Sequence, residues 1–361
     1  MTDNDQRITV NARQLEALLN VCIPRRWNVL VTGAPGIGKT AIVQQTAKTL
    51  GHKLVVTHAA VKDSTDAGGF PVPSAKRDHV HYIPIGEMAQ VVGATQPTVW
   101  FIDDFGQADT AVQKGYMQLL HGRVLNGQRI PECVAIIVAT NRREDKAGVS
   151  TILEPVKSRF HTVVELAVDA NQTIDFMLQS DFAPEVVGFL GIFKNLIHDF
   201  RPTTDLTNSP CPRAWEYASD LIKAQLPRSV EFPALCGTVG VGAATQLRGW
   251  LDHYRGMPDP ALVWKNPDTA PIPSDNPQVL HAYATALAYG VTAETAPQWC
   301  VYAKRLHAAQ QRETCMYLLR ATFRRDKGLT KLPCVREQIL TGQMRKFIQE
   351  VIGYESEGGA A

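Results

Sequence analysis

The feature that most constrains this chain is a glycine-rich run at residues 33–40, which reads GAPGIGKT. It matches the pattern G-x-x-x-x-G-K-[ST], with the apolar stretch 28–31 just before it and a helical pattern just after it. Glycines in such a turn let backbone N–H groups face phosphate oxygens, and the following helix adds the positive end of its dipole. The sequence therefore predicts a nucleotide-binding loop between a strand and a helix.

The loop residues have distinct expected roles. The Lys39 ammonium is expected to reach the β- and γ-phosphates, and the Thr40 hydroxyl is expected to ligate magnesium. A plain glycine turn is the alternative, but the strand and helix on either side favour a nucleotide. The residues predicted to bind it are Gly33, Ala34, Pro35, Gly36, Ile37, Gly38, Lys39, Thr40 and Ala41.

Two adjacent carboxylates, Asp103 and Asp104, follow a second apolar stretch at residues 99–102. Neighbouring side chains leave a strand end in different directions, so one carboxylate can face a metal while the other faces water. We expect Asp103 to hold magnesium and Asp104 to act as the base that polarises the attacking water. An acidic turn after a strand is the alternative interpretation.

Apolar stretches and helical patterns alternate from Trp27 to about Leu166. Continuous apolar strands are typical of a parallel sheet covered by helices on both faces. After that the strand pattern stops, and helical periodicity is interrupted by a proline-rich segment at residues 256–277. We predict an α/β chain with three parts: a P-loop NTPase αβα parallel sheet at 1–165, an all-helical lid with a proline-rich connector at 166–275, and a helical C-terminal extension at 276–361.

Composition excludes several classes of protein. The chain has 361 residues, a formal net charge of +2 and 45% hydrophobic residues, which is a globular composition without a dominant polyanion-binding surface. The apolar runs are too short to cross a bilayer, and the N-terminus has no secretory pattern. Seven widely spaced cysteines without a CxxC pair indicate reduced thiols and no zinc site. We expect a cytoplasmic protein without membrane contact.

Five segments together resemble one family. GAPGIGKT, FIDDFGQA at 101–108, IIVATN at 136–141, EPVKSRF at 154–160 and CPRAWEYAS at 211–219 have the order and spacing of an AAA+ ATPase, and are most similar to the MoxR-like branch. The resemblance covers about residues 25–225. It implies ATP and magnesium as cofactors and self-assembly into a ring, usually a hexamer. It further implies a chaperone-like remodeller of a protein partner, often one with a von Willebrand factor A-type domain.

The resemblance also implies roles for polar residues outside the loop. Asn141 is similar to the sensor that orients water near the γ-phosphate, and Arg213 to the lid residue that reports nucleotide state. Arg159 is similar to the arginine finger that enters the site of the next subunit, with Arg142 and Arg143 as rivals. The alternatives are a strand-ending Asn for Asn141 and solvated surface arginines for Arg159 and Arg213.

One residue departs from the family pattern. The usual acid pair is Asp-Glu, whereas this chain has Asp103-Asp104. The expected base is therefore one methylene shorter, and a general base must come within about 3 Å of the proton that it accepts. Slow hydrolysis is the expected consequence, and a nucleotide switch that barely hydrolyses ATP is a further alternative.

Three other features leave alternatives open. Phe70, after Gly68 and Gly69, is either a grip on a partner chain at a ring channel or a residue tucked onto the core. For His58 we expect core packing rather than restraint of the catalytic carboxylate. The basic segment 320–331 is expected to be a solvated helix face.

The alternative function is nucleic-acid work, as a helicase loader or replication factor acting as an ATP-gated binding module. A dedicated DNA-binding motif or a basic N-terminal arm would favour it, and the sequence contains neither. The remodelling function is therefore preferred.

Overall fold

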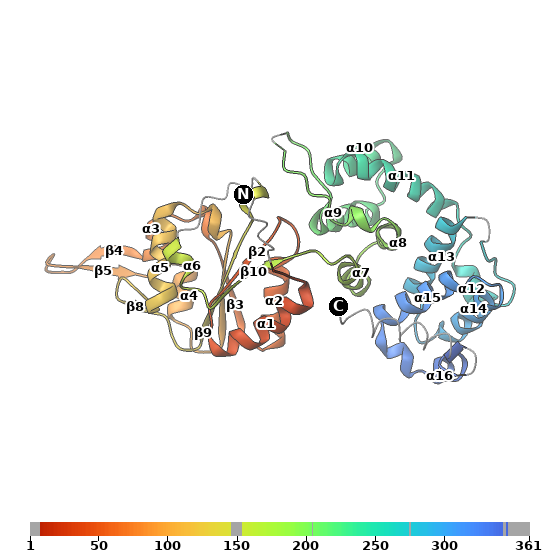
Figure 1. Ribbon diagram of the computed structural model, residues 1–361, viewed down its shortest axis with the longest axis horizontal. Coiled ribbons are helices and arrows are strands. Elements are labelled where there is room, and N and C mark those ends of the chain that lie inside the picture. The colour runs from red at the N-terminus through yellow and green to blue at the C-terminus, as the bar shows by residue number, and fades with distance from the viewer. Residues whose placement is uncertain (1–7, 146–153, 204, 274–275, 342–343, 346–361) are drawn as a thin grey trace, which may run out of the picture. The chain divides into compact units, whose positions relative to one another are not determined.

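The structure, a computed structural model, describes residues 8–145, 154–203, 205–273, 276–341 and 344–345 (Figure 1). The chain divides into two compact units. The first comprises Met1–Asp169, Phe200–Leu206 and Cys211–Arg213, and the second comprises Ala170–Asp199, Thr207–Pro210 and Ala214–Ala361. None of the described helices combines the length and the apolar character needed to span a bilayer.

A parallel sheet with the strand order β1-β10-β2-β9-β6-β3 forms the centre of the first unit. Its central strands are buried along their whole length, as the continuous apolar runs predicted. The register pairs Thr32 with Thr140 and His58 with Asp103, so the carboxyl ends of neighbouring strands lie together. The strands are β1 (Thr9–Val10), β2 (Val29–Thr32), β3 (Lys53–His58), β6 (Thr98–Asp103), β9 (Val134–Thr140) and β10 (Thr162–Leu166).

Helices cover both faces of this sheet (Figure 1). One core contains the buried faces of α1 (Ala12–Arg25) and α2 (Lys39–Thr49), and the other contains those of α4 (Gly86–Val92) and α5 (Thr110–Gly122). Alternate residues of β6 enter the two cores: Phe101 packs on the α1–α2 side and Trp100 on the α5 side. The predicted αβα P-loop NTPase architecture is confirmed.

Segment 64–83 forms a short helix and a hairpin rather than a loop. Helix α3 (Ser64–Gly68) leads into β4 (Phe70–Pro73), which pairs antiparallel with β5 (Val80–Ile83). Phe70 is 55% exposed, so the alternative that it tucks onto the core is wrong. The hairpin is a two-stranded sheet that is not hydrogen-bonded into the central sheet. Two shorter strands, β7 (Val124–Leu125) and β8 (Gln128–Arg129), follow α5, and α6 (Glu154–Lys157) precedes β10.

The described part of the second unit is helical. Trp215, Trp250 and Trp299 are buried in it, and the Trp215 and Trp250 indoles donate to the carbonyl oxygens of Leu196 and Glu185. Its helices are α7 (Ala170–Gln179), α8 (Pro184–Ile192), α9 (Pro212–Lys223), α10 (Arg228–Val239), α11 (Val241–Gly256), α12 (Ala261–Lys265), α13 (Pro277–Gly290), α14 (Ala296–Ala308), α15 (Arg312–Arg325) and α16 (Pro333–Gln338).

The proline-rich segment limits α12 to five residues, in keeping with the missing backbone donors of proline. Helices expected in the lid pack on helices expected in the C-terminal extension, because α13 contacts α8 and α15 contacts α7. The three-part division at residues 165 and 275 stays a prediction.

The basic segment 320–331 is not simply a solvated helix face, which corrects that expectation. Arg320, Arg324 and Arg325 are partly buried. The Arg324 guanidinium lies 2.7 Å from the Asp175 carboxylate, and Arg325 donates to the carbonyl oxygens of Ala288 and Val291. Arg324 is thus paired with α7, and Arg325 with the end of α13, within the helical unit.

Candidate nucleotide-binding site

The glycine-rich run forms a tight turn between β2 and α2. Gly36 and Gly38 have φ angles of +72° and +95°, a region that side-chain-bearing residues rarely occupy. A Cβ atom on Gly36 would also lie 2.7 Å from Cys211 Sγ. Gly38 directly precedes Lys39, the first residue of α2, so the backbone turns into the helix at that glycine. The structure therefore has the strand, loop and helix that a phosphate-binding loop requires.

Lys39 is buried beneath this loop. Its side chain is held by three acceptors: the carbonyl oxygens of Gly33 and Ala34, at 2.8 and 2.9 Å, and Asn141 Oδ1, at 2.8 Å. Desolvation lowers the pKa of Lys39 to about 8, although Asp103, Asp104 and Asp145 oppose this shift. The site thus holds a desolvated cation whose charge an anionic ligand would stabilise.

The structure brings Thr40 and Asp103 together. Thr40 Oγ1 donates to Asp103 Oδ2 at 2.7 Å, and Asp103 is 8% exposed at the end of β6. Hard oxygen donors of this kind, one hydroxyl and one carboxylate, suit Mg²⁺, which is usually held by few protein ligands together with phosphate oxygens and water. The residues present therefore fit a magnesium ion bound with a nucleotide.

Asp104 has an unusual backbone conformation, with a φ angle of +55°. This turns the chain from β6 into a 3-10 helix at Phe105–Gln107 and leaves the Asp104 side chain 39% exposed. Gln107 Nε2 donates to Asp104 Oδ1 at 3.2 Å, and His58 Nδ1 lies 3.7 Å from Asp104 Oδ2. The expected base is thus held by two neighbours and remains accessible to water.

The expected core packing of His58 is wrong. Its side chain is 56% exposed, because His58 is the last residue of β3 and extends past the buried part of the sheet. The register of β3 on β6 sets His58 beside Asp103, which brings its ring to Asp104. His58 is therefore a neighbour of the candidate base.

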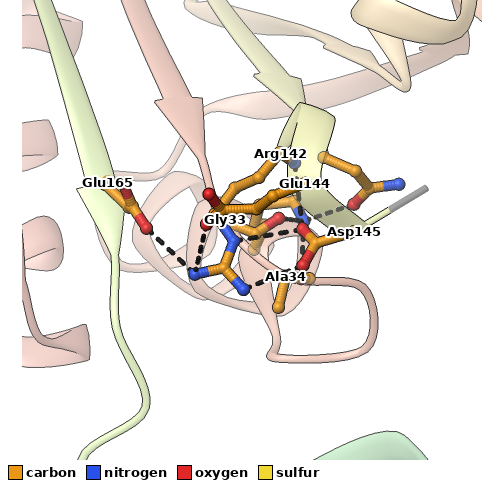
Figure 2. Close-up of polar contacts among 8 residues, drawn as sticks. Gly33, Ala34, Arg142, Glu144, Asp145 and Glu165 are labelled. Carbon is orange, nitrogen blue, oxygen red and sulfur yellow. Dashed lines mark hydrogen bonds and ion pairs between the residues drawn. The ribbon is translucent and has the colours of Figure 1, made fainter. Parts of the chain in front are cut away.

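Arg142, which follows Asn141, is surrounded by carboxylates of its own unit (Figure 2). It donates from Nε and Nη2 to the two oxygens of Asp145, at 3.1 and 2.8 Å, and from Nη1 to Glu165 Oε1 at 3.1 Å. Glu144 lies 3.4 Å from the same guanidinium, and these hydrogen bonds raise the pKa of Arg142 above its ordinary value. Arg142 joins the end of β9 to β10.

Arg213 lies beside the phosphate loop, as its expected role requires. Its backbone N–H donates to the Gly36 carbonyl oxygen at 3.1 Å, and a Cβ on Gly36 would lie 3.3 Å from Arg213 Cβ. The Arg213 side chain is exposed, and its positive charge contributes to the lowered pKa of Lys39. An exposed cation next to a phosphate loop is suited to contact a bound nucleotide.

Arg159 lies near the other end of β2. Asn28, just before that strand, donates from Nδ2 to the Arg159 carbonyl oxygen at 3.3 Å, whereas the phosphate loop follows the strand's last residue. Four residues at about 3.3 Å each separate the two ends by roughly 13 Å. The Arg159 side chain donates to the Pro155 carbonyl oxygen and lines a cavity of about 460 Å³ with residues of α5 and the β7–β8 turn.

Sequence reasoning missed four residues of this site. Asp145 and Glu165 hold Arg142, Gln107 contacts Asp104, and Cys211 contacts Gly36. Two of these contacts are local, because Asp145 is three residues from Arg142 and Gln107 is three residues from Asp104. The contacts of Glu165 and Cys211 depend on tertiary packing.

Comparison with known proteins identifies the domain. Residues 28–160 match the family model of the AAA domain (dynein-related subfamily). No curated protein matches the chain.

Solved structures with a related arrangement include two bacterial proteins. The *Thermotoga maritima* RuvB Holliday junction branch migration motor is 17% identical over 82% of this chain and 86% of its own, with a TM-score of 0.38. NtrX from *Brucella abortus* in complex with ADP is 13% identical over 88% of this chain and 68% of its own, with a TM-score of 0.41. Both are distant likenesses.

The lowered pKa of Lys39 predicts a pH-dependent stability. Between pH 8 and 10.5 the unfolded chain binds a proton at Lys39 that the folded chain has lost, so stability rises with pH. Lys39 should add about 3 kcal/mol to the free energy of unfolding of the nucleotide-free protein across this range. Urea unfolding at several pH values should show this rise, and Lys39→Met should remove it. Lys48→Met, at an exposed position of the same helix, should retain it. Identical pH profiles for the two variants would contradict the prediction.

The ion pairs of Arg142 predict that substitution of this residue lowers the free energy of unfolding. Arg142→Gln removes the guanidinium that pairs with the carboxylates of Asp145 and Glu165, which are 4% and 9% exposed. Loss of one partner of a buried ion pair costs about 3–5 kcal/mol. Arg143→Gln, at the exposed next residue, should change stability by about 0.5 kcal/mol or less. Denaturant unfolding measures both, and equal effects would show that the ion-pair network does not stabilise the fold.

Proposed function

We propose that the AAA domain at residues 28–160 binds ATP together with magnesium and hydrolyses it. One observation carries this proposal: four side chains from three separate parts of the sequence meet at the carboxyl ends of adjacent parallel strands. Lys39 contacts Asn141 at 2.8 Å, and Thr40 contacts Asp103 at 2.7 Å. In parallel α/β sheets this edge is where ligands bind.

Each residue has a defined part in the reaction. Lys39 would hold the phosphate oxygens, and Thr40 and Asp103 would hold magnesium, which would supply positive charge to the triphosphate. Asp104 polarises the attacking water and takes up its proton at a carboxylate oxygen, while Asn141 orients that water. His58 and Gln107, which contact the Asp104 carboxylate, act as positioning residues.

The position of Arg159 supports a site completed by a second subunit. The Arg159 backbone lies near the end of β2 that is farthest from Lys39. Arg159 therefore cannot reach a nucleotide bound by its own subunit. We assign the trans arginine role to Arg159 of the partner subunit, whose charge would stabilise the transferred phosphoryl group. Arg142 is less suited to the trans arginine role, because three carboxylates of its own unit already surround it. Arg143 is the alternative to Arg159 in this role.

The ring and its partner are the finer part of the proposal. We propose a hexameric, MoxR-type remodeller in the cytoplasm that acts on a protein partner, such as one with a von Willebrand factor A-type domain. Arg213 would report the nucleotide state to the helices that follow it. The ion pair and carbonyl contacts of Arg324 and Arg325 support this function over nucleic-acid binding, because those cations are directed into the helical unit.

A mixing experiment tests the shared site. ATP turnover per subunit should rise with protein concentration, and Lys39→Ala should abolish nucleotide binding. Arg159→Ala should bind ATP normally but lower turnover by about 10³-fold, because a trans arginine contributes about 10³ to 10⁵ in rate. When either variant is mixed into unaltered protein, turnover should fall by more than the fraction of inactive subunits alone explains. A rate independent of concentration and untouched by Arg159→Ala would instead indicate a monomeric switch.

Substitutions of Asp104 test the base. Asp104→Asn should retain ATP binding and lower kcat by about 10²-fold or more, because general bases contribute about 10²–10⁴. Asp104→Glu restores the reach of the usual acid pair, so it should raise kcat above that of the unaltered chain. Steady-state turnover and the nucleotide retained on the protein measure both effects. Unchanged turnover in Asp104→Asn would remove this residue from the mechanism.

A further inference from the structure

A cavity of about 300 Å³ lies within the helical unit, apart from the nucleotide site. Helix α7, the end of α8 with the turn after it, and α15 contribute its walls. Its apolar wall is made by Ile174, Leu178 and Ala321. Asn171, Lys194, Tyr317, Arg320 and Arg324 supply its polar groups, and Gly191 completes the lining.

The polar side of this cavity is positively charged. Among the described residues that line it, Lys194, Arg320 and Arg324 are cationic and none is acidic. Two of the cations are fixed in position: Lys194 Nζ donates to Asn171 Oδ1 at 2.9 Å, and Arg324 pairs with Asp175 at 2.7 Å. Cations that converge on one cavity from separate elements are suited to a multivalent anion.

Polar side chains also pack against Gly191, one of the lining residues. Gly191 has no side chain there, and a Cβ atom would lie 2.8 Å from His281 Nε2 and 3.5 Å from Tyr317 Oη. Tyr317 Oη is hydrogen-bonded to Thr285 Oγ1 at 3.0 Å, and its ring lies 3.8 Å from that of His281. His281 Nε2 is buried and has no hydrogen-bond partner among the described residues. Buried polar atoms without partners often mark the position of a water molecule or a ligand.

We propose that this cavity binds a small phosphomonoester. Lys194, Arg320 and Arg324 hold the phosphate, and the organic part packs on Ile174, Leu178 and Ala321. The volume suits a small organic phosphate, since ligand pockets begin at about 300 Å³. Arginine guanidinium groups are well shaped for paired hydrogen bonds to phosphate oxygens. The site is independent of the nucleotide loop, so it would give the helical unit its own ligand.

Calorimetric titration of the full chain tests the site, with Lys39→Ala as background to disable the phosphate loop. The probes are inorganic phosphate and phenyl phosphate. Phenyl phosphate should bind with a Kd below 1 mM, at least threefold tighter than inorganic phosphate, because only phenyl phosphate contacts the apolar wall. Equal affinities would overturn the assignment of that wall, and absence of binding at 10 mM would overturn the site.

Matched variants locate the binding. Lys194→Gln and Arg320→Gln should each raise the Kd for phenyl phosphate about tenfold, because each removes a charge-assisted hydrogen bond. Arg336→Gln, at an exposed position of α16, should leave it unchanged. The same affinity in all three variants would overturn the proposal.

Chemical footprinting of the unaltered chain tests the site without any substitution, so it does not depend on whether a variant folds. Lys194 is exposed enough to be acetylated, and phenyl phosphate should slow its modification at least threefold, as measured by mass spectrometry. Lys331, an exposed lysine outside the cavity, serves as the reference. Equal slowing at both lysines, or slowing at neither, would overturn the proposal.

Discussion

The first unit depends on the burial of one cation. Lys39 is 7% exposed, and removal of a charged group from water is costly unless hydrogen bonds replace the lost solvent. The replacements come from two carbonyl oxygens of the glycine-rich loop and from the Asn141 amide at the end of β9. Both the tight turn and the pairing of β2 with β9 are therefore needed to keep Lys39 in place. Its pKa of about 8 shows that these groups compensate only in part, which leaves a site whose electrostatics favour a bound anion.

A second cation nearby, the half-buried Arg142, is stabilised in a different way. Arg142 is matched by carboxylates of Asp145 and Glu165, and its pKa is raised rather than lowered. Because Asp145 also lies close enough to affect Lys39, the two cations share one electrostatic neighbourhood. Lys39 is under-compensated and open to a ligand, whereas Arg142 is satisfied and joins strands β9 and β10. This contrast separates a ligand-binding group from a structural one, although Asn141, which contacts Lys39, and Arg142 are adjacent in sequence.

Much of the first unit could be predicted because its signals are local. The strand, the glycine turn and the helix of residues 28–50 are continuous in sequence, and continuous apolar runs identify the buried strands. The meeting of Thr40 with Asp103 follows from the rule that parallel strands end at the same edge. His58 could not be placed in this way, because whether a strand's last residue is buried depends on the register with β6. Arg320 and Arg324 depend on which helix packs against α15, and helical periodicity alone does not reveal that partner.

Two requirements compete at residue 104: a left-handed backbone conformation, which favours a short side chain, and the reach of the carboxylate, which favours a longer one. The φ angle of +55° lets Asp103 face Thr40 while Asp104 lies beside His58. Among residues with side chains, Asp and Asn tolerate this left-handed conformation best, because their short polar groups hydrogen-bond locally. Glutamate would reach farther but would fit this backbone less readily. An aspartate at this position therefore combines a stable turn with a carboxylate, and the methylene lost in reach is the cost of holding two acids at one strand end in different directions.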